Sequence, residues 1–193
     1  MSGKRLVMAA ALLAVAQIGF LSWMIAGRAA VLREGQEVLL KVEPIDPRDL
    51  LRGDYVRLNY EIRDVPVKLV ENAPPGEFVA ENGSVFVRLG KDPDGYWRVR
   101  LARLGEPSTT AVGPDEIDIR GSISRGWALR PDDSFSVQYG IDRYYVPEGE
   151  GRAIEADMRE RPFGILAAVG SDGVPQIKAL MDGDTRLYEE PLY

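Results

Sequence analysis

The chain has 193 residues and contains neither cysteine nor histidine. The absence of cysteine excludes disulfide bridges, thiol nucleophiles and thiolate metal sites. The absence of histidine excludes a Ser-His-Asp triad and imidazole metal ligands. The chemistry that remains open rests on carboxylates, lysine, serine and tyrosine, and the sequence leads us to expect no cofactor and no metal site.

Charged side chains are missing from one long stretch near the amino terminus. Residues 6–27 read LVMAAALLAVAQIGFLSWMIAG, and Gln17 and Ser22 are the clearly polar positions in this run. At about 1.5 Å per residue, a helix of this length spans a hydrocarbon core of roughly 30 Å. Trp23 lies near the end of the run, where interfacial aromatic residues are frequent. The pattern predicts a transmembrane helix over 6–27, and a buried core helix is the structural alternative.

A cleaved signal peptide is the second alternative, because a basic start before an apolar run is also its signature. The run is longer than the roughly 7–15 apolar residues of a signal peptide. Ala14–Ala16 lies too early for a cleavage site, and Arg28 and Arg33 interrupt the small-residue pattern that such a site needs. These features favour an uncleaved signal anchor.

The charge balance suggests an orientation for this anchor. Basic residues flank the run on both sides, so the positive-inside rule gives nearly a tie. Without Lys4 and Arg5, the rest of the chain carries 22 basic and 30 acidic residues. Such an acidic domain has no electrostatic reason to stay at an anionic leaflet or to bind nucleic acid. We expect a cytoplasmic tip (1–5), a single-pass anchor in the cytoplasmic (inner) membrane (6–27) and an extracytoplasmic domain (28–193).

The soluble part is predicted to be mainly β, a β-rich α+β domain that follows one transmembrane helix. Short alternating apolar runs are separated by clusters of Gly, Pro and Asp, as in β-rich folds. The predicted strands are 36–42, 55–62, 84–89, 96–101, 117–123, 135–139, 164–169, 175–180 and 185–188. Turn residues at 91–95 predict a hairpin, and two later turns predict a meander of the last three strands. Short helices are predicted over 47–52 and 151–161.

The segment GDYVRLNY at 53–60 stands at the entry to a predicted strand. Its period of two places Val56, Leu58 and Tyr60 on one face, which we assign to the core. The opposite face is polar and partly aromatic, and we predict that it forms a binding surface. The predicted surface consists of Arg52, Asp54, Tyr55, Arg57 and Asn59.

Five residues of this segment match every fixed position of the motif that defines the GDYXXLXY family. They are Gly53, Asp54, Tyr55, Leu58 and Tyr60. The chain also resembles these membrane-anchored bacterial proteins at 46–52, 139–149 and 189–193. The resemblance implies a single N-terminal anchor, a domain of unestablished role and an association with multi-spanning membrane proteins. It supplies no catalytic residues.

A remoter similarity concerns type I signal peptidases, in which a Ser-Met-x-Pro segment precedes a Gly-Asp strand. Residues 44–56 are similar to that stretch, but Pro44 stands where the nucleophilic serine would fall. No serine lies between Ser22 and Ser84, so a relative of this kind would be inactive. A hydrolase that uses a Ser/Lys pair or paired carboxylates is the alternative function, and the sequence leans towards a protein that is not an enzyme.

A second surface is predicted around residues 143–150, where tyrosine and arginine, the residue types favoured at interface hot spots, adjoin acidic residues. Its candidate docking residues are Arg143, Tyr144, Tyr145, Glu148 and Glu150. The leading hypothesis is a membrane-anchored, extracytoplasmic binding or accessory domain. We expect it to belong to a membrane protein complex, with an integral membrane protein as partner and the bilayer contacted through 6–27.

Overall fold

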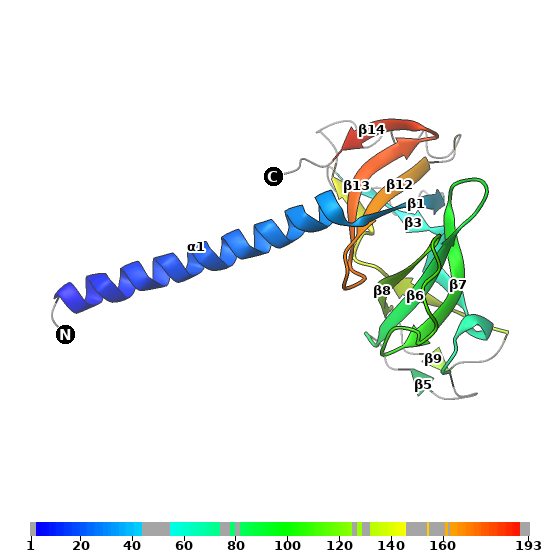
Figure 1. Ribbon diagram of the computed structural model, residues 1–193, viewed down its shortest axis with the longest axis horizontal. Coiled ribbons are helices and arrows are strands. Elements are labelled where there is room, and N and C mark those ends of the chain that lie inside the picture. Colours follow the sequence, from blue (N-terminus) through cyan, green and yellow to red (C-terminus); the bar gives the residue numbers. More distant parts are fainter. Residues whose placement is uncertain are drawn as a thin grey trace.

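The protein consists of one long helix that projects from a β domain (Figure 1). The computed structural model describes residues 3–43, 55–73, 78–79, 82–124, 127–128, 132–145, 154, 161 and 163–189. The strands are β1 (Gln36–Glu43), β2 (Tyr55–Arg57), β3 (Asn59–Tyr60), β4 (Asp64–Pro66), β5 (Phe78–Val79), β6 (Ser84–Lys91), β7 (Trp97–Leu104), β8 (Glu116–Ile123), β9 (Trp127–Ala128), β10 (Ser134–Gln138), β11 (Arg143–Tyr145), β12 (Phe163–Val169), β13 (Pro175–Asp182) and β14 (Thr185–Glu189). The helices are α1 (Gly3–Glu34) and the 3-10 turns η2 (Glu61–Arg63) and η3 (Val67–Leu69).

Helix α1 extends well beyond the predicted span of 6–27 and reaches Glu34. Its 32 residues correspond to a length of about 48 Å. Among the described residues, α1 is the one helix that is long and apolar enough to cross a membrane. The mean hydropathy of its most apolar stretch of 18 residues is 2.0. None of that window is buried against the domain. A signal sequence near the amino terminus has the same length and apolar composition.

The last turns of α1 are part of the folded domain. Ala29 and Leu32 are buried, and α1 contacts β12 and β13. One residue, Gly35, separates the helix from β1, and its N–H donates a hydrogen bond of 2.9 Å to the carbonyl oxygen of Val31. A Cβ at this position would lie 2.5 Å from that oxygen and 3.0 Å from the carbonyl oxygen of Val169. The close approach therefore requires glycine, and it makes the junction between helix and sheet short and tight.

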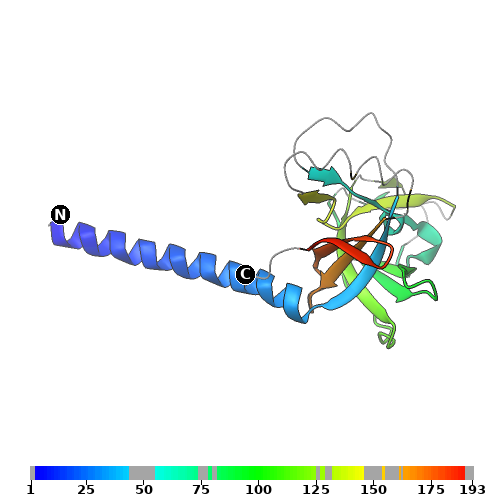
Figure 2. The same ribbon diagram turned by 90° about the horizontal axis from the view of Figure 1, so that it is seen from above.

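Two five-stranded antiparallel sheets form the body of the domain, and Figure 2 shows them from a second direction. The first has the order β14-β13-β12-β1-β3, so the predicted C-terminal meander is confirmed. The second has the order β4-β10-β8-β6-β7, and the predicted hairpin at 91–95 joins β6 to β7. Two small ribbons, β2 with β11 and β5 with β9, complete the described sheets.

Both large sheets contribute to one hydrophobic core. Alternate apolar residues of β6 and of β1 are buried, in agreement with the predicted period of two. These apolar residues are Val38, Leu40, Val42, Val85, Val87 and Leu89, and in β6 the intervening Arg88 is buried as well. Residues of β8, β10 and β12 join the same core cluster. The predicted β-rich class is confirmed, and its core sits between the sheets.

The predicted strand over 55–62 is divided in the structure. It is replaced by β2, β3 and η2, because the chain changes its pairing partner at Leu58. Before Leu58 the backbone pairs with β11, and after it β3 pairs with β1. The predicted helix over 47–52 lies outside the described residues. Of the predicted helix over 151–161, the described positions are Ile154, which is helical and buried, and Arg161.

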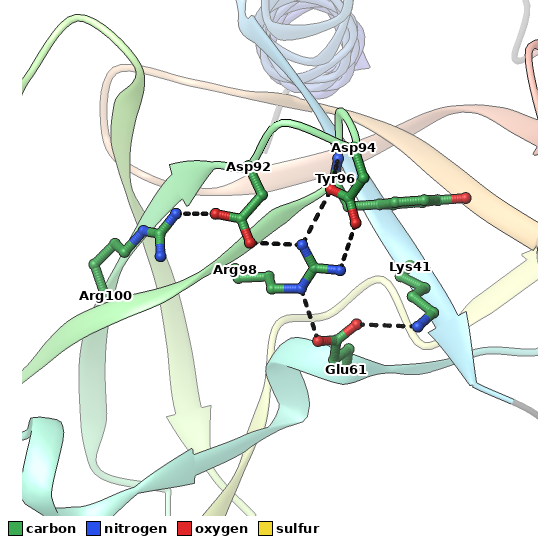
Figure 3. Close-up of polar contacts among 7 residues, drawn as sticks. All are labelled: Lys41, Glu61, Asp92, Asp94, Tyr96, Arg98 and Arg100. Atoms are coloured by element: carbon green, nitrogen blue, oxygen red, sulfur yellow. Dashed lines mark hydrogen bonds and ion pairs between the residues drawn. The ribbon is translucent and has the colours of Figure 1, made fainter.

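A cluster of ion pairs bridges the sheets at the β6–β7 hairpin (Figure 3). Arg98 donates hydrogen bonds to Glu61 of η2 at 2.9 Å, to Asp92 at 2.6 Å and to Asp94 at 2.7 Å. Arg100 also pairs with Asp92, and Lys41 of β1 approaches Glu61 to 3.6 Å. Two hydrogen bonds lower the pKa of Asp92: the one from Arg98 has the larger effect and the one from Arg100 the next largest. The hydrogen bond from Arg98 also lowers the pKa of Asp94. These aspartates are therefore ionised partners of arginine in a structural contact.

One arginine is almost completely buried. Arg88 of β6 is 1% exposed, and its guanidinium donates two hydrogen bonds to the Asp118 carboxylate, at 2.8 and 2.9 Å. A third bond of 3.2 Å goes to the carbonyl oxygen of Ala111. The hydrogen bond to Asp118 raises the pKa of Arg88, so the pair stays charged. Removal of Arg88 would leave Asp118, whose side chain is 17% exposed, as a partly buried charge without its partner.

We predict that Arg88→Ala lowers the free energy of unfolding by about 3–5 kcal/mol, because Asp118 loses its charged partner. The measurement is denaturant unfolding of the detergent-solubilised chain, followed by circular dichroism. The exposed pair Arg186–Glu189 offers the control, and Arg186→Ala should cost no more than about 1 kcal/mol. The double variant Arg88→Met/Asp118→Leu should recover much of the loss, and a double variant as unstable as Arg88→Ala would contradict the explanation.

Candidate functional site

Two residues of the predicted core face of the GDYVRLNY segment lie in the core. Leu58 and Tyr60 are buried, as predicted, while Arg57 is exposed and Asn59 is half-buried. Asn59 donates a hydrogen bond of 3.2 Å to Glu43 and accepts one of 2.9 Å from Arg63. The backbone of Tyr55 lies in β2. Arg52 and Asp54 of the predicted binding surface lie outside the described residues.

The two predicted surfaces meet in one ribbon. Strand β11 pairs with β2 in an antiparallel register that places Arg143 opposite Arg57 and Tyr145 opposite Tyr55. Arg143 is exposed and Tyr145 is 69% exposed, whereas Tyr144 is buried and belongs to the core. Glu148 and Glu150 lie outside the described residues. The structure thus brings together, in backbone register, residues that the sequence assigned to separate surfaces.

Three hydrogen bonds attach the segment 139–142 to residues 58–62, the end of the motif and the turn that follows it. The N–H of Leu58 donates to the carbonyl oxygen of Asp142 at 2.9 Å. The hydroxyl of Tyr60 donates to the carbonyl oxygen of Ile141 at 2.6 Å, and the hydroxyl of Tyr139 donates to that of Ile62 at 2.8 Å. Burial raises the pKa of both tyrosines, so both hydroxyls remain protonated donors. Leu58 and Tyr60, two fixed residues of the motif, therefore hold this segment in place.

The segment forms one wall of a groove beside the helix, which we call the α1 groove. It has a volume of about 940 Å³. Its lining consists of Trp23, Met24, Gly27 and Arg28 of α1, of Gln138, Gly140, Ile141, Asp142, Arg143 and Tyr145, and of Pro175, Gln176 and Ile177 of β13. The groove is therefore formed by three separate parts of the chain: helix α1, the segment 139–142 with its neighbours, and strand β13 of the C-terminal meander.

The lining of the α1 groove combines apolar and charged side chains. Trp23 is 73% exposed and Met24 is 53% exposed, so large apolar surfaces of α1 face this space. Arg28, Asp142 and Arg143 supply charges. Burial raises the pKa of Asp142, and the nearby charges of Arg63 and Arg143 oppose that rise. A concave surface with apolar walls and a few polar groups is typical of a binding site.

The sequence alone does not predict that the helix residues or the β13 residues of the groove belong to a site. It predicts that Trp23 lies at the membrane interface and that Arg28 flanks the anchor. No local signal connects either residue with Ile177, because three distant segments form the groove. In the sequence, the neighbouring apolar residues Trp23 and Met24 just before Arg28 are the feature that could have drawn attention to this part of the helix.

Two lysines and two serines that could serve a Ser/Lys hydrolase have other partners. Lys41 pairs with Glu61, and Lys178 donates a hydrogen bond of 2.7 Å to Glu37. The hydroxyl of Ser124 donates to the carbonyl oxygen of Ser136 at 2.9 Å. The hydroxyl of Ser136 in turn donates to Asp64 at 2.6 Å. The hydrolase alternative therefore gains no Ser/Lys contact in these four residues.

We predict that Tyr60→Phe weakens the wall of the α1 groove. The variant leaves the buried carbonyl of Ile141 without its donor, which should cost about 1–3 kcal/mol of unfolding free energy. Hydrogen exchange supplies the specific measurement: the Leu58 amide, which bonds Asp142 in the same contact, should exchange faster. Tyr96→Phe is the control at a half-buried position of the β6–β7 hairpin. Unchanged exchange at Leu58 in Tyr60→Phe would contradict the positioning role.

Comparison with known proteins gives one family. The model of the family described as GDYXXLXY protein matches residues 17–180, from the second half of α1 into β13. Searches of curated proteins and of solved structures gave no significant match. The matched region includes the motif, the segment attached to it and all the residues that line the α1 groove. The chain therefore belongs to the GDYXXLXY protein family.

Proposed function

We propose that the protein is a membrane-anchored binding or accessory domain, and that it acts in a complex with an integral membrane protein. In this proposal residues 6–27 are an uncleaved single span with residues 1–5 in the cytoplasm, and the domain from residue 28 stands outside the cytoplasmic membrane. The uncharged run and the acidic balance of the following 166 residues support this arrangement.

The position of the α1 groove on the helix is the observation that carries the proposal. Trp23 and Met24 belong to the last turn and a half of the uncharged run, and Arg28 is the first charge after it. A span that fills the hydrocarbon core therefore places these groove residues at the level of the lipid headgroups, where tryptophan is favoured. The exposed Tyr145 on the domain side of the groove fits the same interfacial level.

The lining indicates the class of partner. A groove at the membrane surface is open to molecules that are themselves in or beside the bilayer. Its apolar side chains suit a segment that emerges from the membrane, and Arg28 and Arg143 suit an acidic residue at the end of such a segment. We therefore assign the groove to the juxtamembrane segment of an integral membrane protein.

Orientation can be tested with single cysteines, because the natural chain contains none. We predict that Val112→Cys, at an exposed loop position, reacts with a membrane-impermeant maleimide on intact cells or spheroplasts. A cysteine in place of Ser2 should react only after lysis. The measurement is the labelled fraction by mass shift. The reverse pattern would contradict the extracytoplasmic placement of the domain.

Filling the groove tests the binding role. A Cβ at Gly27 meets nothing within 4 Å, so Gly27→Trp places a large side chain in the groove without displacing the core. We expect the integral membrane protein that copurifies from mild detergent to fall by about tenfold or more, which corresponds to about 1.4 kcal/mol of lost binding. Gly19→Trp is the matched control, since Gly19 also has open space and lies outside the groove. Recovery of the wild-type chain alone, or an unaffected Gly27→Trp, would contradict the proposal.

A further inference from the structure

The helix carries one polar side chain at the centre of its apolar run. Gln17 lies eleven residues after Leu6 and ten residues before Gly27. At 1.5 Å per residue, it is about 15 Å or more from either end of the run, which is the middle of a hydrocarbon core of roughly 30 Å. A glutamine side chain is much shorter than this distance. Its amide therefore has no access to water once the helix spans the bilayer.

The described part of the chain offers this amide no partner. Gln17 is exposed, and none of the apolar window of α1 is buried against the domain. A carboxamide has two donors and an acceptor, and leaving them unpaired in hydrocarbon is costly. In membranes such side chains form hydrogen bonds across helices. A polar group on a second transmembrane helix would supply the hydrogen bonds that the Gln17 amide lacks.

The face that carries Gln17 leads directly to the α1 groove. Residues spaced alternately by four and three positions form one seam along a helix that packs against another. From Gln17 this spacing gives Leu21, Met24 and Arg28 towards the domain, and Ala14 and Ala10 towards the amino terminus. Met24 and Arg28 line the α1 groove. Ala10 and Ala14 are small, which permits close approach of a second helix.

We propose that this seam, from Ala10 to Arg28, docks a transmembrane helix of the integral membrane partner. The partner helix hydrogen-bonds the Gln17 amide at mid-depth through a side chain such as Asn, Gln, Ser or Thr. Its extramembrane continuation enters the α1 groove, where an acidic residue pairs with Arg28. The inference rests on the proposed function and specifies how the partner is recognised inside the bilayer.

A second copy of this chain fits the seam less well than a partner of another kind. The domain stands over the carboxyl-terminal end of this helix face, because Met24 and Arg28 share the groove with β13 and the segment before β11. A parallel second copy would bring its own domain, of equal size, to the same side of the seam. A helix that continues into a short segment occupies the groove without this clash.

The first test is photo-crosslinking in native membranes. A photoreactive amino acid in place of Met24 should give an adduct with an integral membrane protein, identified by mass spectrometry. The same replacement at Ala26 is the matched control, because it lies at nearly the same depth and about 200° around the helix. Equal adducts from both positions, adducts with lipid alone, or an adduct with a second copy of this chain would each overturn the inference.

The second test addresses the amide itself. Gln17→Leu should reduce partner recovery about tenfold, whereas Gln17→Asn should retain most of it. Ser22→Ala is the control, since Ser22 is polar but lies on another side of the helix. If Gln17→Leu still recovers the partner while Gly27→Trp does not, the inference that the seam docks a helix is wrong and the proposed function stands. If the wild-type chain has no partner, both fail.

Discussion

The tight junction at Gly35 determines how the helix and the domain relate to one another. A single residue links α1 to β1, and the close contacts with Val31 and Val169 leave no room for a side chain. Because Ala29 and Leu32 are buried on the same side, the end of the helix is packed on the first sheet as well as tethered to it. The α1 groove exists because this junction holds the domain beside the helix. A flexible linker would leave no defined space between them.

The α1 groove also depends on the attachment of the segment 139–142 to Leu58 and Tyr60 of the motif. Leu58 and Tyr60 face inward and bond the backbone of Asp142 and Ile141. Leu58 and Tyr60, two fixed residues of the motif, thus have architectural roles, and the segment that they hold in place belongs to another part of the chain. That segment leads into β11 and so to Arg143 and Tyr145 of the α1 groove.

Local patterns predicted most of the sheets. The alternation at Val85, Val87 and Leu89, and the turn residues at 91–95, specify a hairpin with one buried face, because both signals act over a few residues. The pairing of β2 with β11 could not be predicted, since it joins residues far apart in the chain. The extension of α1 to Glu34 was missed for a related reason: Arg28 and Arg33 read as a flank, and the burial of Ala29 and Leu32 depends on the fold. The α1 groove combines three such distant contacts. The predicted residues Arg52, Asp54, Glu148 and Glu150 lie outside the described part of the chain.

The absence of histidine gives the protein an electrostatic surface that varies little over physiological pH, with the exception of Asp142 in the α1 groove, whose pKa is raised by burial. Histidine is the side chain whose ordinary pKa places a charge change between about pH 5 and 8. Here the buried tyrosines have raised pKa values and the aspartates beside Arg98 have lowered ones, so these groups titrate still further from that range. The guanidinium group of arginine, as a residue type, does not lose its charge in this range. A contact made through Arg28 and Arg143 would therefore persist when the surroundings become mildly acidic, and its strength would vary with ionic strength instead.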